Sequence, residues 1–97
     1  MNILIVEDDP IITDALTLIL KEGGYNSFQA SDINSALNEM KYSTVEGVIL
    51  DLNLPDGDGT RLVRLIRKIY IPVPILVVSD NSSVDQRINA LGAASDG

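Results

Sequence analysis

Two kinds of hydrophobic pattern alternate along this chain. Short runs with strand character occupy positions 2–6, 25–30, 47–50 and 75–78. The run at 47–50 is apolar throughout, as expected of a strand that is buried on both faces. Between the runs, apolar residues recur at spacings of three and four, which indicates helices. The pattern therefore predicts four strands, each followed by a helix.

The first two predicted helices carry start signals. Asp9 and Pro10 have the character of an N-cap and a first helical residue, and two glycines after Glu22 end the first helix. Ser31 is expected to cap the second helix. The expected inner face of the first helix consists of Ile12, Leu16, Ile19 and Leu20. The expected inner face of the second consists of Ile33, Ala36, Leu37 and Met40.

The third predicted helix follows a loop rich in Gly, Asp and Pro at positions 53–59. It is expected to extend to about Tyr70, with its basic residues on the outer surface. A last helix is expected after a cap at Ser82 or Ser83. The expected inner face of the third helix consists of Leu62, Val63, Ile66 and Ile69.

This order of elements predicts an α/β fold. Strand–helix units with right-handed crossovers form an open parallel sheet with helices on both faces. Ligands of such sheets bind at the carboxyl ends of the strands. Glu7, Asp8, Asp51 and Ser79 all follow directly after predicted strands, so we expect them to meet at one edge of the sheet.

The three acids in this set suggest a cation site. Like charges repel, so a cluster of Glu7, Asp8 and Asp51 needs a cation or a raised pKa. Carboxylate oxygens with open positions suit Mg²⁺, which keeps waters and takes one or two carboxylates together with phosphate oxygens. Asp51 would then be a metal-assisted nucleophile for a phosphoryl group.

Composition narrows the function classes. The 97 residues predict a single domain over 1–97, and the net charge of −7 argues against nucleic-acid binding by this segment. Cysteine and histidine are absent, which excludes disulfides and thiolate or imidazole chemistry. No apolar stretch approaches the ~20 residues of a membrane span, and no secretion signal is apparent. We therefore expect a cytoplasmic protein with no membrane segment.

Four motifs in this order resemble the receiver domain of bacterial two-component response regulators. They are LIVEDDP, VILDLNLPDGDG, PILVVSD and ALGAASDG, and together they cover the whole chain. The resemblance implies a doubly wound, flavodoxin-like parallel sheet with strand order 2-1-3-4, because the chain ends at Gly97 before the family's fifth strand and helix. The natural protein is expected to continue beyond this point.

The resemblance also implies roles for individual residues. Asp51 matches the phosphoacceptor, and Glu7 and Asp8 match the acidic pair that binds Mg²⁺, with Asp8 as the direct ligand. Asn53 matches the position whose backbone carbonyl also binds the metal. Ser79 matches the hydroxyl that moves toward the phosphoryl group when the domain is switched on.

The same resemblance implies partners. The phosphoryl donor would be a sensor histidine kinase or a histidine phosphotransfer protein, and an output domain, most often DNA-binding, would lie beyond Gly97. The domain would accept a phosphoryl group onto itself and would not be a turnover enzyme. Without the fifth unit, the fourth strand becomes an exposed edge and the first helix loses a neighbour, so homodimerisation through either surface is the alternative to a longer natural protein.

Two alternatives remain open at this point. The family's lysine would come after Gly97, and Asp80 stands where the family has a small residue. Both departures support a docking or dimerisation module that takes up no phosphate. The second alternative is a phosphatase with an aspartyl nucleophile, but that pattern requires Asp two residues after the nucleophile, where this chain has Asn53.

The remaining charged residues have simpler interpretations. Asp9 is interpreted as a helix cap, and Asp56 and Asp58 as turn and cap residues. The spacing around them does not fit a calcium loop, because Gly is missing at the sixth position and no Glu closes the loop. The third helix carries a basic run that is interpreted as a solvated face rather than a docking surface. The run comprises Arg61, Arg64, Arg67 and Lys68.

Overall fold

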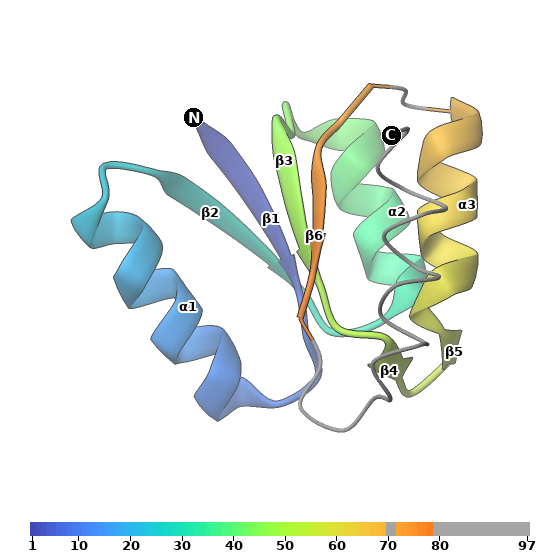
Figure 1. Ribbon diagram of the computed structural model, residues 1–97, viewed down its shortest axis with the longest axis horizontal. Coiled ribbons are helices and arrows are strands. Elements are labelled where there is room, and N and C mark those ends of the chain that lie inside the picture. Colours follow the sequence, from blue (N-terminus) through green and yellow to red (C-terminus); the bar gives the residue numbers. More distant parts are fainter. Residues whose placement is uncertain (70–71, 79–97) are drawn as a thin grey trace.

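A computed structural model, which describes residues 1–69 and 72–78, contains a four-stranded parallel sheet at its centre (Figure 1). The order across the sheet is β2-β1-β3-β6, which confirms the predicted order 2-1-3-4 for the four long strands. The strands are β1 (Asn2–Val6), β2 (Asn26–Ala30), β3 (Gly47–Leu50) and β6 (Ile75–Val77).

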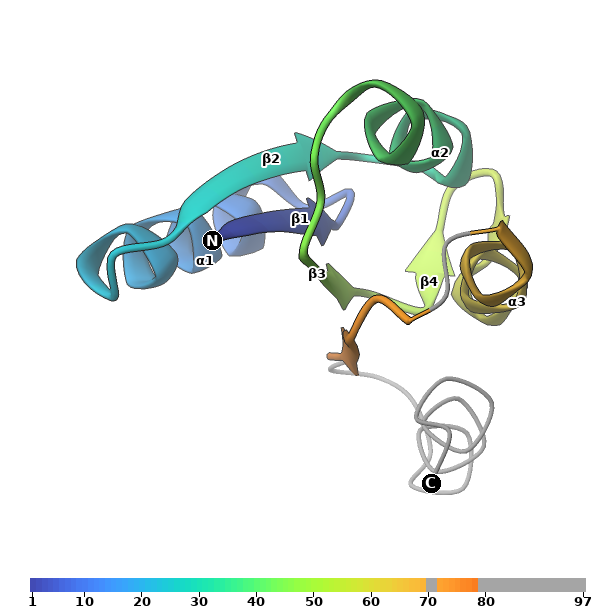
Figure 2. The same cartoon turned by 90° about the horizontal axis from the view of Figure 1, so that it is seen from above.

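Helices cover both faces of the sheet, as the alternating pattern predicts (Figure 2). One face is covered by α1 (Pro10–Glu22), and the other by α2 (Ile33–Tyr42) and α3 (Gly59–Ile69). The main core lies between the sheet and the α2–α3 layer, where alternate strand residues meet the apolar faces of both helices. Its fully buried members include Leu4, Leu50, Leu62, Val63 and Ile66.

The α1 face of the sheet is covered less completely. None of the α1 residues is buried, and α1 contacts β1 and β2. Ile19 is 62% exposed, so its predicted place on the inner face of the helix is wrong. On the same side of the sheet, Leu76 of β6 is 58% exposed. Apolar side chains therefore remain accessible on this side, within the part of the chain that the structure describes.

The helix boundaries show which local signals were reliable. The Asp9 side chain accepts a hydrogen bond from the Ile11 N–H at 2.9 Å, and the first helix ends at Gly23, both as predicted. The cap of α2 is Asp32 and not Ser31. Asp32 accepts the Ser35 N–H and Ser35 reaches back to the Asp32 N–H, forming a capping box that Ser31 is one position too early to form.

The segment after Asp51 is more regular than the predicted loop. It contains a short antiparallel hairpin of β4 (Asn53–Leu54) and β5 (Gly57–Asp58). Gly57 has a φ of +155°, a conformation that favours glycine, and this accommodates the tight turn. Composition predicted the turn residues but not the pairing, because two residues per strand leave no periodicity to detect.

Two predictions for α3 are corrected. Ile69 is 59% exposed and is not part of the inner face, because it ends the helix beyond the last buried turn at Ile66. Arg67 does not face solvent like its basic neighbours, because its guanidinium donates to the Val73 carbonyl and helps to hold the connection to β6.

The predicted last helix, Ser79 and Asp80 lie outside the described residues. Within residues 1–69 and 72–78, no helix has the length and apolar character needed to cross a membrane.

Candidate metal centre

The parallel register of the sheet brings the predicted acids together. Val6 of β1 is aligned with Leu50 of β3, so the residues that follow them emerge side by side. The ladder continues one step beyond the strands, because the Asp51 N–H donates to the Val6 carbonyl at 2.9 Å. The Glu7 N–H likewise donates to the Ala30 carbonyl at 3.0 Å. These bonds hold the backbone of Glu7 and Asp51 at the carboxyl edge of the sheet.

The carboxylates of Glu7, Asp8 and Asp51 form one cluster, as the sequence predicted. Each residue offers one oxygen, and these oxygens all lie within 4.8 Å of one another. Two oxygens on one octahedral Mg²⁺ are separated by about 3 to 4 Å, given metal–oxygen distances of about 2.1 Å. A small contraction of the cluster would therefore let all three oxygens bind one ion. The donor set, three hard anionic oxygens, fits a small divalent cation.

Glu7 is the buried member of this cluster. Its side chain is 8% exposed, and burial raises its pKa from 4.5 to about 7. The Asp9 N–H, which donates to Glu7 Oε1 at 3.1 Å, opposes this shift, whereas the negative charge of Asp51 adds to it. Because the three acids repel one another, a cation at this position would relieve an electrostatic cost that the fold imposes.

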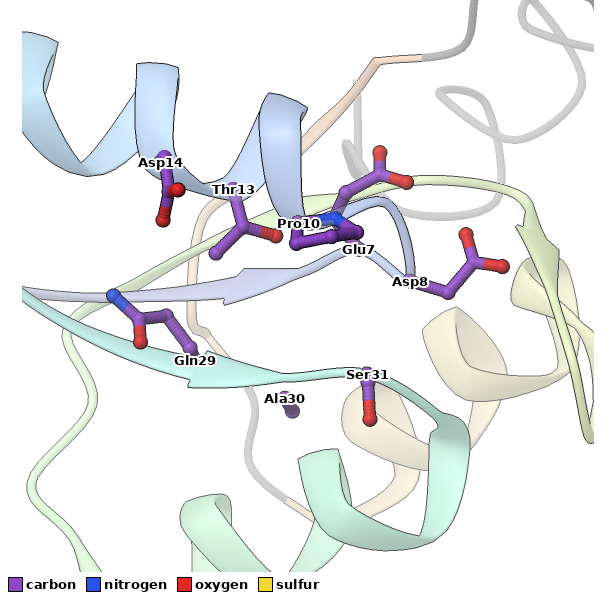
Figure 3. A pocket seen from close by; sticks show the side chains of 8 residues that line it. All are labelled: Glu7, Asp8, Pro10, Thr13, Asp14, Gln29, Ala30 and Ser31. Atoms are coloured by element: carbon purple, nitrogen blue, oxygen red, sulfur yellow. The ribbon is translucent and has the colours of Figure 1, made fainter.

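Asp8 and Asp51 are more accessible. Asp8 is exposed beyond the end of β1, whereas Asp51 is partly buried. The Asn53 N–H donates to Asp51 Oδ1 at 3.1 Å and orients this carboxylate. Asp9 acts as a helix cap, as predicted. Asp14 is exposed, lies farther along α1 than the acidic pair, and is drawn among the side chains of Figure 3.

A hollow of about 330 Å³ adjoins the acidic pair. Figure 3 shows it between the first turns of α1 and the end of β2. Residues from both elements line it, with Thr13 on one side and Gln29 and Ser31 on the other. Glu7 and Asp8 also line this hollow, whereas Asp51, the third acid of the cluster, does not.

Gly59 brings the start of α3 against the backbone of Asp51 and Leu52. A Cβ atom at this position would lie 2.7 Å from the Asp51 carbonyl oxygen and 2.7 Å from Leu52 Cα. The Gly59 N–H also donates to the Leu52 carbonyl at 2.7 Å. The end of the predicted loop at positions 53–59 is thus built on a close contact that only glycine permits.

The structural role of Asp56 in this region was not predicted from the sequence. Asp56, interpreted from sequence as a turn residue, accepts hydrogen bonds from the first amides of α2. Its partners lie more than twenty positions earlier in the chain, so no local pattern could reveal the link.

The sequence matches the family described as response regulator receiver domain over residues 3–97. Among curated proteins, it is 38% identical over 95 residues to the KDP operon transcriptional regulatory protein KdpE of Escherichia coli. That alignment covers 98% of this chain and 42% of KdpE. The cell cycle response regulator CtrA of Brucella ovis is 29% identical over 96 residues, with coverage of 99% and 41%. The chain thus spans about two fifths of the length of these relatives.

Solved structures agree with this match. The receiver domain of the Francisella response regulator 1452 superposes with a TM-score of 0.87 at 26% identity, covering 98% of this chain and 78% of that one. The response regulator protein TrrA of Thermotoga maritima, solved in complex with Mg²⁺ and a beryllium fluoride, gives a TM-score of 0.86 at 30% identity. That superposition covers 96% of this chain and 80% of TrrA.

Proposed function

Because the chain belongs to the response regulator receiver domains of two-component systems, we propose that it accepts a phosphoryl group on Asp51 with the help of Mg²⁺. The observation that carries this proposal is the cluster of Glu7, Asp8 and Asp51 at the carboxyl ends of two neighbouring strands. The presence of Mg²⁺ in the structure of the related TrrA supports the choice of metal.

In the proposed mechanism, Glu7, Asp8, Asp51 and the Asn53 carbonyl hold the ion. When bound, Mg²⁺ neutralises charge on the cluster and on the phosphoryl oxygens. The residues of the chain mainly position the reactants, because the transition state of phosphoryl transfer is loose. The Asn53 N–H orients Asp51 through Oδ1.

The reaction forms one bond and breaks another. An oxygen of Asp51 attacks the phosphorus of a phosphohistidine, and the bond between phosphorus and the imidazole nitrogen breaks. The electron pair of that bond stays on the imidazole, which takes up a proton from solvent. The product is an acyl phosphate on Asp51, so the domain modifies itself and has no turnover of its own.

The proposed signal then passes to other parts of the protein. The Ser79 hydroxyl would hydrogen-bond a phosphoryl oxygen that exists only in the modified state, which is what a switch requires. The donor would be a histidine kinase or a histidine phosphotransfer protein in the cytoplasm. The printed names of KdpE and CtrA support a regulatory output, with transcription as the proposed target.

The proposal is tested by intact-mass spectrometry after incubation with acetyl phosphate. We expect one phosphoryl increment with Mg²⁺ and none with a chelator or in Asp51→Asn. Asp58→Asn is the matched control, because Asn keeps the acceptor oxygen that Asp58 offers to the Thr60 N–H and lies in the same loop. Absence of the increment from the unmodified protein, with Mg²⁺ still bound, would contradict phosphoacceptor function and leave the docking module in its place.

A further inference from the structure

The tip of the β4–β5 hairpin is bound to the start of α2 through Asp56. The Ile33 N–H donates to Asp56 Oδ1 at 2.8 Å, and the Asn34 N–H donates to Asp56 Oδ2 at 3.2 Å. The two oxygens thus take two of the four backbone donors that a helix leaves unpaired at its N-terminus. Packing reinforces the link, because a Cβ atom on Gly57 would lie 3.1 Å from Ile33 Cδ1.

This link is not needed simply to cap α2. The helix already has its own cap in Asp32, whose Oδ1 accepts the Ser35 N–H at 2.7 Å. The same Ser35 N–H, together with the Ser35 hydroxyl, holds the pKa of Asp32 below its usual range. Asp56 binds the two preceding amides, which Asp32 does not reach. Its distinctive effect is to connect two separate elements.

The base of the hairpin is attached to the phosphoacceptor. The Asn53 N–H donates to Asp51 Oδ1 at 3.1 Å, and Gly59 closes the other strand against Leu52 at 2.7 Å. The hairpin pairs Asn53 with Asp58 and Leu54 with Gly57, so it is too short to bend independently at its two ends. Restraining its tip should therefore restrain Asn53 at its base.

From these contacts we propose that Asp56 is a positioning residue for the metal and phosphoacceptor site. By anchoring the hairpin to α2, it fixes the Asn53 N–H that orients Asp51 and the Asn53 carbonyl that is proposed to bind Mg²⁺. The inference rests on the proposed function, because it concerns the same site. It also means that α2, which does not contribute a carboxylate, helps to hold the hairpin next to the site.

Thermodynamic linkage gives the inference a reciprocal consequence. If holding the hairpin tip favours Mg²⁺ binding, then Mg²⁺ must favour the held tip by the same factor. Added Mg²⁺ should therefore slow hydrogen exchange of the Ile33 and Asn34 amides, which donate hydrogen bonds to Asp56. A residue that merely stabilised α2 would not make exchange there depend on the metal.

The test compares Asp56→Ala with Asp56→Asn in the 97-residue chain. Mg²⁺ affinity is measured by calorimetry, and amide exchange by NMR with and without Mg²⁺. We expect Asp56→Ala to weaken Mg²⁺ binding by about tenfold, as for other residues that support metal ligands, and to abolish the Mg²⁺ effect on Ile33 and Asn34. Asp56→Asn keeps one acceptor oxygen, so it should restore part of the affinity.

Two control variants separate positioning from other effects. Asp32→Ala weakens the same helix N-terminus but leaves the hairpin link, so it should lower stability without changing Mg²⁺ affinity. Asp58→Asn removes a charge from the same hairpin and should also leave the affinity near that of the unmodified protein. Equal loss of affinity in Asp32→Ala and Asp56→Ala, or no loss in Asp56→Ala, would overturn the inference.

The outcome is distinguishable from a failure of the proposed function. If the unmodified protein binds Mg²⁺ and becomes phosphorylated while Asp56→Ala behaves identically, only the positioning role is overturned. If the unmodified protein binds no Mg²⁺, both the positioning role and the metal-dependent function are overturned.

Discussion

A buried carboxyl group beside two other acids is costly to ionise, and Glu7 is in this position. Its pKa of about 7, against 4.5 for an ordinary glutamate, means that the native state binds more protons than the unfolded state between these values. In the metal-free protein, the contribution of Glu7 to stability is therefore complete below pH 4.5 and is lost as the pH rises through 7. A bound cation would oppose the raised pKa of Glu7, because it favours the ionised form of the carboxyl group.

We expect Glu7→Gln to remove this pH dependence. With a chelator present to remove metal ions, the free energy of unfolding of the variant should exceed that of the unmodified protein by about 1 to 3 kcal/mol at pH 8. The difference should shrink toward pH 5. Urea unfolding at both pH values measures the change. Glu22→Gln, at the exposed end of α1, is the control. An unchanged pH profile in Glu7→Gln would contradict the account of Glu7.

At the scale of elements, α3 has one apolar face and one basic face. The burial of its apolar face ends at Ile66, before the last residue of the helix. Leu62 is fully buried between the helix and the sheet, whereas Ile69 is largely exposed although both were expected inside. Ile69 is the last residue of α3 and follows its last buried residue, Ile66. Apolar residues of the same helix should therefore differ sharply in their effect on stability.

Leu62→Ala should lower the free energy of unfolding by about 2 to 5 kcal/mol, because it removes buried methyl groups and leaves a cavity. Ile69→Ala in the same helix should change it by less than about 0.5 kcal/mol. Chemical denaturation of the two variants measures both values. Similar losses would mean that Ile69 is buried in solution and that the observed end of α3 is wrong.

The elements show which parts of the fold and site were predictable. Hydrophobic pattern predicted β3 at its exact bounds, and the parallel topology then placed Asp51 beside Glu7. The cap of α2 was misplaced by one residue, because Ser31 and Asp32 are both good caps and only the capping box with Ser35 decides between them. The partners of Asp56 depend on how separate elements pack, which periodicity along the chain does not contain.

At the scale of the whole molecule, charge and hydrophobic surface act in opposite directions. The net charge of −7 keeps copies apart, whereas the exposed apolar residues on the α1 face and along β6 favour contact between them. β6 is also the edge strand of the sheet that the structure describes. Self-association through this side therefore remains a prediction, and its strength should depend on how far salt screens the net charge.

We expect the protein to associate weakly and to do so more strongly as salt screens its net charge. Leu76→Lys should reduce the association, since it places a charge on the apolar face next to the sheet edge. Sedimentation at several protein and salt concentrations measures the effect. Tyr42→Lys, at an exposed position in α2 on the other side of the sheet, should leave association unchanged. Equal effects of the two substitutions would exclude this surface.

The close approach of Gly59 to Asp51 also limits how this sequence can evolve. Any side chain at position 59 would have to displace the backbone of Asp51, and that backbone sets where the proposed phosphoacceptor carboxylate lies. Relaxation of a loop makes many substitutions tolerable, but relaxation of this loop would move the Asp51 carboxylate away from Glu7 and Asp8. Sequences that keep Asp51 in this place must therefore also keep glycine at position 59.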